Sequence, residues 1–83
     1  MGINEAVTAI EELLDTYSGG GAKPLAIQIR PSGDDVDVIK IWVDLGVARV
    51  DLAAWEKACE AAIREAIPGA AAFRLQLRAE RDA

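Results

Sequence analysis

The sequence predicts an α+β protein built as a two-layer α/β sandwich, with two helices packed on one face of a three-stranded sheet. Two segments repeat apolar residues at spacings of three and four, a pattern typical of amphipathic helices. Three others alternate apolar and polar residues, a pattern typical of half-buried strands. In chain order the segments run helix, strand, strand, helix, strand. Because each has a single apolar face, two layers are the simplest way to bury all five.

The first helix is predicted over about 4–17. Asn4 is a suitable N-cap, and the Ser-Gly-Gly-Gly run at 18–21 ends the helix because glycine adopts the left-handed stop conformation at little cost. The carboxylates of this segment fall mainly off its apolar stripe. That stripe consists of Ile3, Val7, Ile10, Leu14 and Tyr17.

Two strands joined by a turn follow the first helix. The first strand is predicted over 25–30, and its apolar face consists of Leu25, Ile27 and Ile29. Residues 31–35 carry strong turn chemistry, and the second strand runs from about 36 to 44. The apolar face of the second strand consists of Ile39, Ile41 and Val43.

The last third of the chain predicts a second helix and a third strand. The stretch before it, 45–50, is ambiguous, since Gly46 fits either a bulge or the start of a loop. Asp51 is in the N-cap position of the helix, which ends at Pro68-Gly69. The third strand is predicted over 72–79. A right-handed crossover makes it parallel to the second strand, while the order of the strands stays open.

Length and charge narrow the class of protein. The 83 residues suit one domain, and we expect a single compact unit over 1–83 with frayed ends at 1–3 and 80–83. The net charge is −5, so the overall field does not attract nucleic acid or anionic lipid. No apolar run is long enough to cross a membrane, and no secretory leader is visible. We therefore expect a cytoplasmic protein with no membrane partner.

Several kinds of reaction centre lack their usual residues. The chain has no histidine and one cysteine, which excludes an internal disulfide and a Cys/His zinc site. Cys59 lies on the apolar stripe of the second helix, where we expect a small buried hydrophobe. The glycines at 19–21 are not followed by the Lys-Ser/Thr pair of a phosphate loop.

The hairpin turn carries three acidic residues, but they do not have the spacing of a known calcium loop. Asp34, Asp35 and Asp37 lack the glycine and distal glutamate of an EF-hand, so we expect a solvated turn. The sequence therefore predicts a protein that is not an enzyme and that has no catalytic residue, no cofactor and no metal.

The polar face of the sheet is the most informative feature for function. If the three branched residues of the second strand face the helices, Trp42 lies on the open side among basic residues. If Val36 and Val38 set the inward face instead, Trp42 enters the core. Tryptophan and arginine are enriched in binding hot spots. The candidate partner-binding residues are Trp42, Arg30, Lys40, Arg74 and Arg78.

Three interpretations of this face stay open: it is simply solvated, it binds protein, or it binds single-stranded nucleic acid. The last is the weakest, because RNA-binding sheets usually carry several aromatic residues and this one carries a single tryptophan. We expect a small non-enzymatic interaction module that acts by binding and self-associates through the open face or an edge strand.

Two other hypotheses compete with the interaction module. The first is a small acidic inhibitor of phage type, which mimics nucleic acid and blocks a host nucleic-acid-binding enzyme with its helix carboxylates. Those carboxylates are Glu5, Glu11, Glu12, Asp15, Glu56 and Glu60. The second is a designed protein without a biological role, against which the scarcity of lysine argues.

Parts of the sequence also resemble known families. The element order is similar to that of the cytoplasmic domain of cation diffusion facilitators. The Trp-Val-Asp-Leu-Gly-Val run at 42–47 and the later Ile67-Pro68-Gly69 resemble the C-terminal half of alkaline-shock proteins, and the latter run also resembles NifU-type iron–sulfur scaffolds. These resemblances cover about 25–79 and imply shared architecture. They imply no functional residue, because the metal-binding histidines and the CxxC motif of those families are absent.

Overall fold

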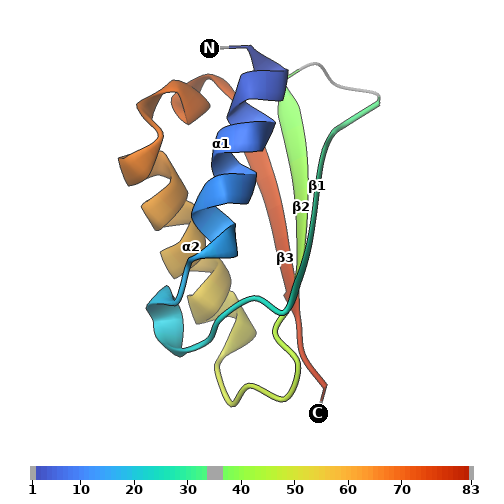
Figure 1. Ribbon diagram of the computed structural model, residues 1–83, viewed down its shortest axis with the longest axis vertical. Helices are drawn as coiled ribbons and strands as arrows, with labels where there is room; N and C mark the ends of the chain where they lie inside the picture. Colours follow the sequence, from blue (N-terminus) through green and yellow to red (C-terminus); the bar gives the residue numbers. More distant parts are fainter. Residues whose placement is uncertain (1, 34–36, 83) are drawn as a thin grey trace.

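The computed structural model describes residues 2–33 and 37–82, and it has the predicted two layers (Figure 1). Its elements are α1 (Ile3–Asp15), the 3-10 turn η1 (Gly19–Gly21), β1 (Ala26–Pro31), β2 (Val38–Asp44), α2 (Leu52–Ala66), the 3-10 turn η2 (Pro68–Ala72) and β3 (Arg74–Glu80). Both helices lie on one side of the sheet, with α1 beside β1 and α2 beside β3. The predicted α+β class and the α-β-β-α-β order are confirmed.

The sheet has the strand order β1-β2-β3. β1 is antiparallel to β2, with Gln28 opposite Trp42, and β3 is parallel to β2, with Arg78 opposite Trp42. The predicted parallel pairing of the third strand is confirmed. The strand order, which the sequence left open, places β2 in the centre and leaves β1 and β3 as the two edges.

The direction of the backbone hydrogen bonds follows from two contacts at the start of β2. The Ser32 amide donates to the Val38 carbonyl at 2.9 Å, and the Arg74 amide donates to the Asp37 carbonyl at 2.6 Å. Even-numbered residues of β2 therefore bond to β1, and odd-numbered ones bond to β3. All of β2 is engaged, whereas alternate residues of β1 and of β3 turn their amide and carbonyl groups away from the sheet.

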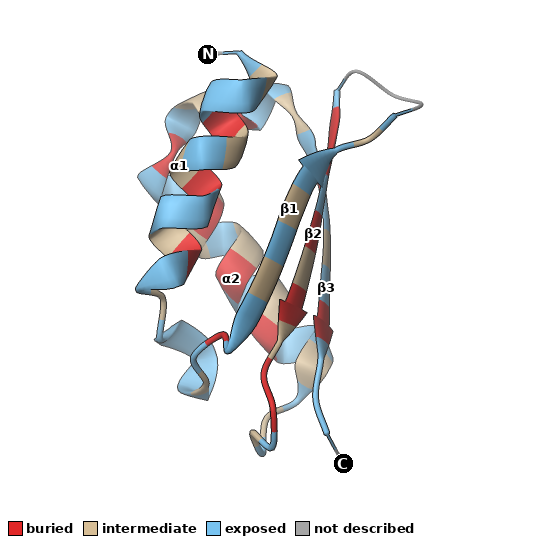
Figure 2. Cartoon of the chain, turned by 45° about the vertical axis from the view of Figure 1, so that its right-hand side comes forward, coloured by how far each residue is buried: buried red, intermediate tan, exposed pale blue. Residues whose placement is uncertain are grey.

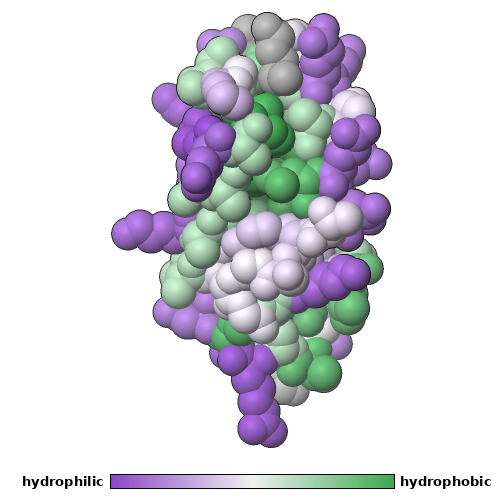
Figure 3. Space-filling model, turned by 60° about the vertical axis from the view of Figure 1, so that its left-hand side comes forward, coloured by the Kyte–Doolittle hydropathy of each residue, from purple (hydrophilic) through white to green (hydrophobic). Residues whose placement is uncertain are grey.

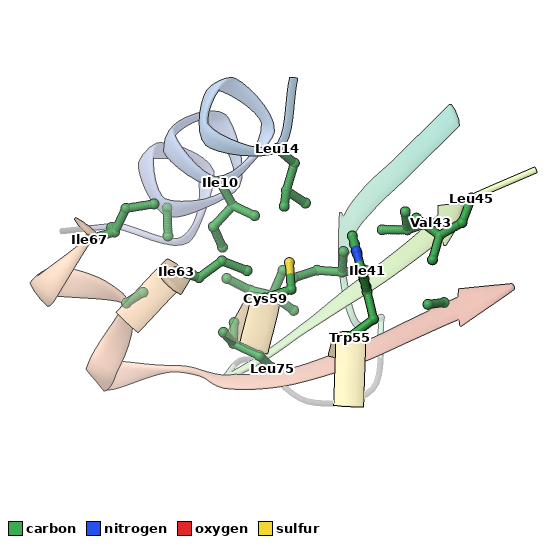
Figure 4. Close-up of a cluster of buried hydrophobic side chains, with 14 residues drawn as sticks. Ile10, Leu14, Ile41, Val43, Leu45, Trp55, Cys59, Ile63, Ile67 and Leu75 are labelled. Atoms are coloured by element: carbon green, nitrogen blue, oxygen red, sulfur yellow. The ribbon is translucent and has the colours of Figure 1, made fainter. Parts of the chain in front are cut away.

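The core lies between the helices and the sheet (Figures 2 and 4). Ile39, Ile41 and Val43 are at most 2% exposed, so the predicted inward face of β2 is confirmed. Cys59 of α2 is buried with them, as its place on the apolar stripe predicted, and Trp55 of the same helix is buried too. α1, which lies on the same side of the sheet as α2, adds Ala6, Ile10 and Leu14 to the core.

Several predicted boundaries were wrong near the ends of elements. Asn4 does not cap α1: the helix begins at Ile3 after an extended Gly2, and the Asn4 carbonyl accepts a hydrogen bond from the Thr8 hydroxyl. Leu25 does not join the inward face of β1. It is 73% exposed, and its side chain lies against Gly46.

The loop before α2 and the turn after it were predicted only in part. Gly46 starts a loop, with φ of +64° and with its amide donating to the Asp44 carboxylate at 2.9 Å, so the strand does not continue. The Asp51 carboxylate accepts from the Ala53 amide at 3.2 Å, which confirms the predicted N-cap. The α-helix stops before Pro68 as predicted, but the chain then forms η2, and β3 begins at Arg74 instead of 72.

The expectations for the chain ends and for the hairpin turn involve residues at or beyond the limits of the described ranges. Ile3 and Glu80, which we expected in frayed ends, lie in α1 and β3. The predicted start of the second strand at 36, together with Asp34 and Asp35 of the acidic turn, lies outside the described residues.

Candidate functional site: the open face of the sheet

The face of the sheet opposite the helices collects polar side chains in cross-strand rows. The ladders bring together Arg30, Lys40 and Gln76 in one row and Gln28, Trp42 and Arg78 in the next, with Ala26, Asp44 and Glu80 beyond them. Arg74 lies beside Val38 at the other end. We call this surface, from the Arg74 row to the Glu80 row, the open face.

Trp42 lies at the middle of the open face. It is half-buried and belongs to the same side of β2 as Lys40, while its neighbours Ile41 and Val43 point into the core. The alternative in which Val38 sets the inward face is therefore wrong for the described part of β2. Val38 shares the side of Trp42, although it is itself only 5% exposed.

All five predicted partner-binding residues lie on this one surface. Trp42, Arg30, Lys40 and Arg78 line a depression of about 490 Å³ together with the two glutamines Gln28 and Gln76. Arg74 lies outside the depression. The four cations are exposed, so their charges are available to a partner.

The charges on the open face are segregated along the strands. The cations Arg30, Lys40, Arg74 and Arg78 occupy the end where β2 and β3 begin and the middle. The carboxylates of Asp44 and Glu80 occupy the end where those two strands finish. Between them lies Trp42, so the face has a basic end, an aromatic middle and an acidic end.

Glu80 also belongs to this surface, which we did not predict. We assigned it to a frayed tail, whereas β3 continues to Glu80 and its carbonyl accepts a hydrogen bond from the Leu45 amide at 2.8 Å. The signal was present in the alternation Arg74, Gln76, Arg78, Glu80, which keeps its period of two to the end.

The helix carboxylates do not form one free acidic surface. On the side of the molecule shown in Figure 3, hydrophilic side chains lie along both flanks with hydrophobic ones between them. The Glu56 carboxylate accepts a hydrogen bond from the Ala79 amide of β3 at 2.8 Å. Glu60 forms an ion pair with Arg64, four residues further along α2, at 3.4 Å. Two of the six acids assigned to the inhibitor hypothesis are therefore engaged within the chain.

Cys59 and Tyr17 have perturbed acidities that suit a core and not a reaction centre. Burial, and secondarily the negative charge of Glu60, raise the pKa of Cys59 to about 12. Burial likewise raises the pKa of Tyr17, whose ring meets Trp55 edge-on at 5.7 Å. A thiol of such high pKa is protonated at neutral pH and is a poor nucleophile.

Neither a metal-binding cluster nor a membrane-spanning helix occurs among the described residues. Over residues 2–33 and 37–82, no group of three or more His, Cys, Asp or Glu side chains is placed to hold a metal ion. None of the helices described in that part of the chain is long and apolar enough to cross a membrane.

Comparison with known proteins adds no relative. No protein family, curated protein or solved structure matches this chain, so the open face has to be interpreted from its own geometry and charge.

Proposed function

We propose that this protein acts by binding, without catalysing a reaction, and that it self-associates through the open face. One observation carries the proposal: the open face is complementary to itself. Its basic end and acidic end lie at opposite ends of the strands, with Trp42 between them.

A two-fold axis that lies between two open faces and runs across the strands brings unlike groups together. Such an axis reverses the strand direction, so that the ends of β3 exchange places. Glu80 of one copy then lies opposite Arg74 of the other, because both belong to β3 at the two ends of the face. Trp42 lies opposite Lys40, since both residues of β2 are one position from the midpoint.

These pairings are chemically favourable. Glu80 of one copy and Arg74 of the other form an ion pair, and this pair occurs twice by symmetry. Lys40 over the ring of Trp42 is a cation–π contact. Like charges directly opposite one another, which would oppose a self-complementary contact, are avoided along β3.

The size of the open face sets the affinity that we expect for the dimer. Three strands spaced about 4.8 Å apart and a span of six residues at about 3.3 Å each give a face of about 300 Å². A stable interface buries about 800 Å² on each partner. The four cations also exceed the two acids on each face, which leaves some repulsion between copies. We therefore expect a weak and reversible dimer.

The first test is the mass in solution, measured by light scattering after size exclusion over a tenfold concentration range. We expect the mass to rise from near 8.8 kDa toward twice that value as the concentration increases. Trp42→Ala should weaken the dimer by more than about tenfold if Trp42 is a hot spot.

A charge exchange tests the orientation of the two copies. Arg74→Glu and Glu80→Arg should each weaken the dimer by facing like charges, and the double variant should restore it. Arg49→Glu makes the same change of charge as Arg74→Glu on an exposed residue outside the open face, so it is the matched control. A monomer at every concentration rejects self-association, and failure of the double variant to restore the dimer rejects this arrangement.

We also propose that the protein works in the cytoplasm. Its one cysteine is a free, buried thiol, as is usual in a reducing compartment.

A further inference from the structure

The two edges of the sheet differ in how far they are closed. At the β3 edge the Glu56 carboxylate accepts from the Ala79 amide, and the Arg64 guanidinium donates to the Phe73 carbonyl at 3.4 Å just before the strand. Charged side chains from α2 thus occupy part of that edge. Natural sheets use such charges to prevent another strand from pairing.

The β1 edge has no comparable cover within the described residues. The ladder to β2 uses the even-numbered residues of β1, so Ile27 and Ile29 turn their amide and carbonyl groups outward. No described side chain is hydrogen-bonded to either of them. Two amides and two carbonyls at the spacing of a strand form a template for one more strand.

A groove runs along this edge, between β1 and α1. It has a volume of about 700 Å³ and is lined by every residue from Pro24 to Arg30. Because consecutive residues point to opposite faces of a sheet, a groove that touches all of them follows the edge of the strand and not one face. Ile27 and Ile29 are partly buried, so the groove has an apolar floor.

The far wall of the groove is acidic. α1 supplies Glu11, Glu12 and Asp15, all exposed, and none of them has an ion pair or a hydrogen-bonded side-chain partner among the described residues. Arg30 is the one cation among the lining residues, and it lies on the strand. The wall therefore favours a positively charged occupant.

We infer that this groove binds an extended, basic segment of another protein, which adds to β1 as a fourth strand. The backbone of the segment bonds to Ile27 and Ile29, and its lysine or arginine side chains meet the acids of α1. A second copy of this chain fits less well. Pairing two β1 edges about a two-fold axis sets the acidic α1 walls of both copies against each other.

A synthetic peptide tests the inference on the whole chain. The probe is a fluorescein-labelled seven-residue peptide that alternates lysine and valine, and binding is followed by fluorescence anisotropy. We expect it to bind at least about tenfold more tightly than the same peptide with glutamate for lysine. The amide resonances of Ile27 and Ile29 should shift on binding, since their hydrogens become bonded.

Backbone methylation separates strand addition from attraction between charges. Two further peptides carry methyl groups on one or the other set of alternate backbone nitrogens, which leaves their charge unchanged. Only one set faces β1 in an added strand. We expect one methylated peptide to lose at least about tenfold in affinity and the other to keep it.

A pair of charge variants locates the acidic wall. The double variant Glu11→Lys with Asp15→Lys should bind the lysine peptide no more tightly than the glutamate peptide. Glu5→Lys with Glu65→Lys changes the net charge equally at exposed residues outside the groove, so it should keep that preference. All four positions are exposed, and circular dichroism checks that each variant is folded.

Several results overturn the inference. It fails if no peptide binds at millimolar concentration, if both methylated peptides bind equally well, or if both charge variants weaken binding to the same extent. It also fails if raising the protein concentration, without peptide, protects the amides of Ile27 and Ile29 from hydrogen exchange. A second copy of the chain would then pair with the β1 edge. These outcomes do not depend on the dimer at the open face, which Arg74 and Glu80 test.

Discussion

Trp42 and Trp55 show how position decides what the same side chain does. Trp55 is 1% exposed, and its indole N–H donates to the Ala22 carbonyl at 3.1 Å, so it joins α2 to the loop after α1. Trp42 is half-buried among cations on the open face. A buried tryptophan with a satisfied N–H stabilises the fold, whereas a partly exposed one beside arginine suits contact with a partner.

The buried thiol of Cys59 makes stability depend on pH at the residue scale. Its pKa is raised from 9.0 to about 12 by burial. Below pH 9 the thiol is protonated in both the folded and the unfolded chain, so it contributes no pH dependence. Between pH 9 and 12 the unfolded thiol ionises and the folded one does not, so the free energy of unfolding falls.

We predict that Cys59→Ala removes this part of the pH dependence. From pH 8 to pH 10 the unsubstituted chain should lose about 1.4 kcal/mol more unfolding free energy than the variant. Denaturant titrations at the two pH values measure the difference. The pKa of Tyr17 is raised mainly by burial, which both proteins share, and secondarily by Cys59, so its contribution to the difference is small. Equal losses in the two proteins would contradict the prediction.

At the scale of elements, one carboxylate joins α2 to an edge strand. The Glu56 side chain lies one turn into the helix and meets the Ala79 amide near the end of β3. A hydrogen bond to a charged group contributes more than a neutral one, but the site is partly exposed, so its contribution is smaller than in a core.

We predict that Glu56→Ala lowers the unfolding free energy by about 1 kcal/mol. The Ala79 amide should also exchange its hydrogen faster, because it loses its acceptor. Denaturant titration and NMR exchange measure the two effects. Glu65→Ala removes an exposed carboxylate of the same helix and should change neither. Unchanged exchange at Ala79 would argue against this role.

At the scale of the whole molecule, the core and the two surfaces proposed for binding are separate. The core lies between the helices and the sheet, whereas the open face and the β1 edge are outside it. The fold therefore does not need a partner to complete its core. A weak dimer at the open face adds little to stability at ordinary concentrations.

We predict that the midpoint of thermal unfolding changes by less than about 2 °C over a tenfold range of protein concentration. Arg74→Glu, which weakens the proposed dimer, should leave the midpoint nearly unchanged. Calorimetry or circular dichroism measures it. A midpoint that rises steeply with concentration would instead indicate that the folded chain depends on its dimer.

Local patterns in the sequence predicted most of the fold. Helical spacing placed Cys59 in the core, and strand alternation placed Ile39 and Ile41 on the side of the helices. These predictions succeeded because the period of a helix or strand sets the side of each residue by itself. The errors fell at Asn4 and Leu25, near element ends, where loop contacts compete with the local pattern.

What the sequence alone determined was therefore the class of fold, the order of the elements and most of the buried side chains. Only the tertiary structure decided the strand order, the rows that unite Trp42 with Arg78, and the difference between the two edges. It also showed that Glu56 covers one edge while Ile27 leaves the other open. These features join residues far apart in the chain, and pairing between distant strands depends on packing in three dimensions that no local period specifies.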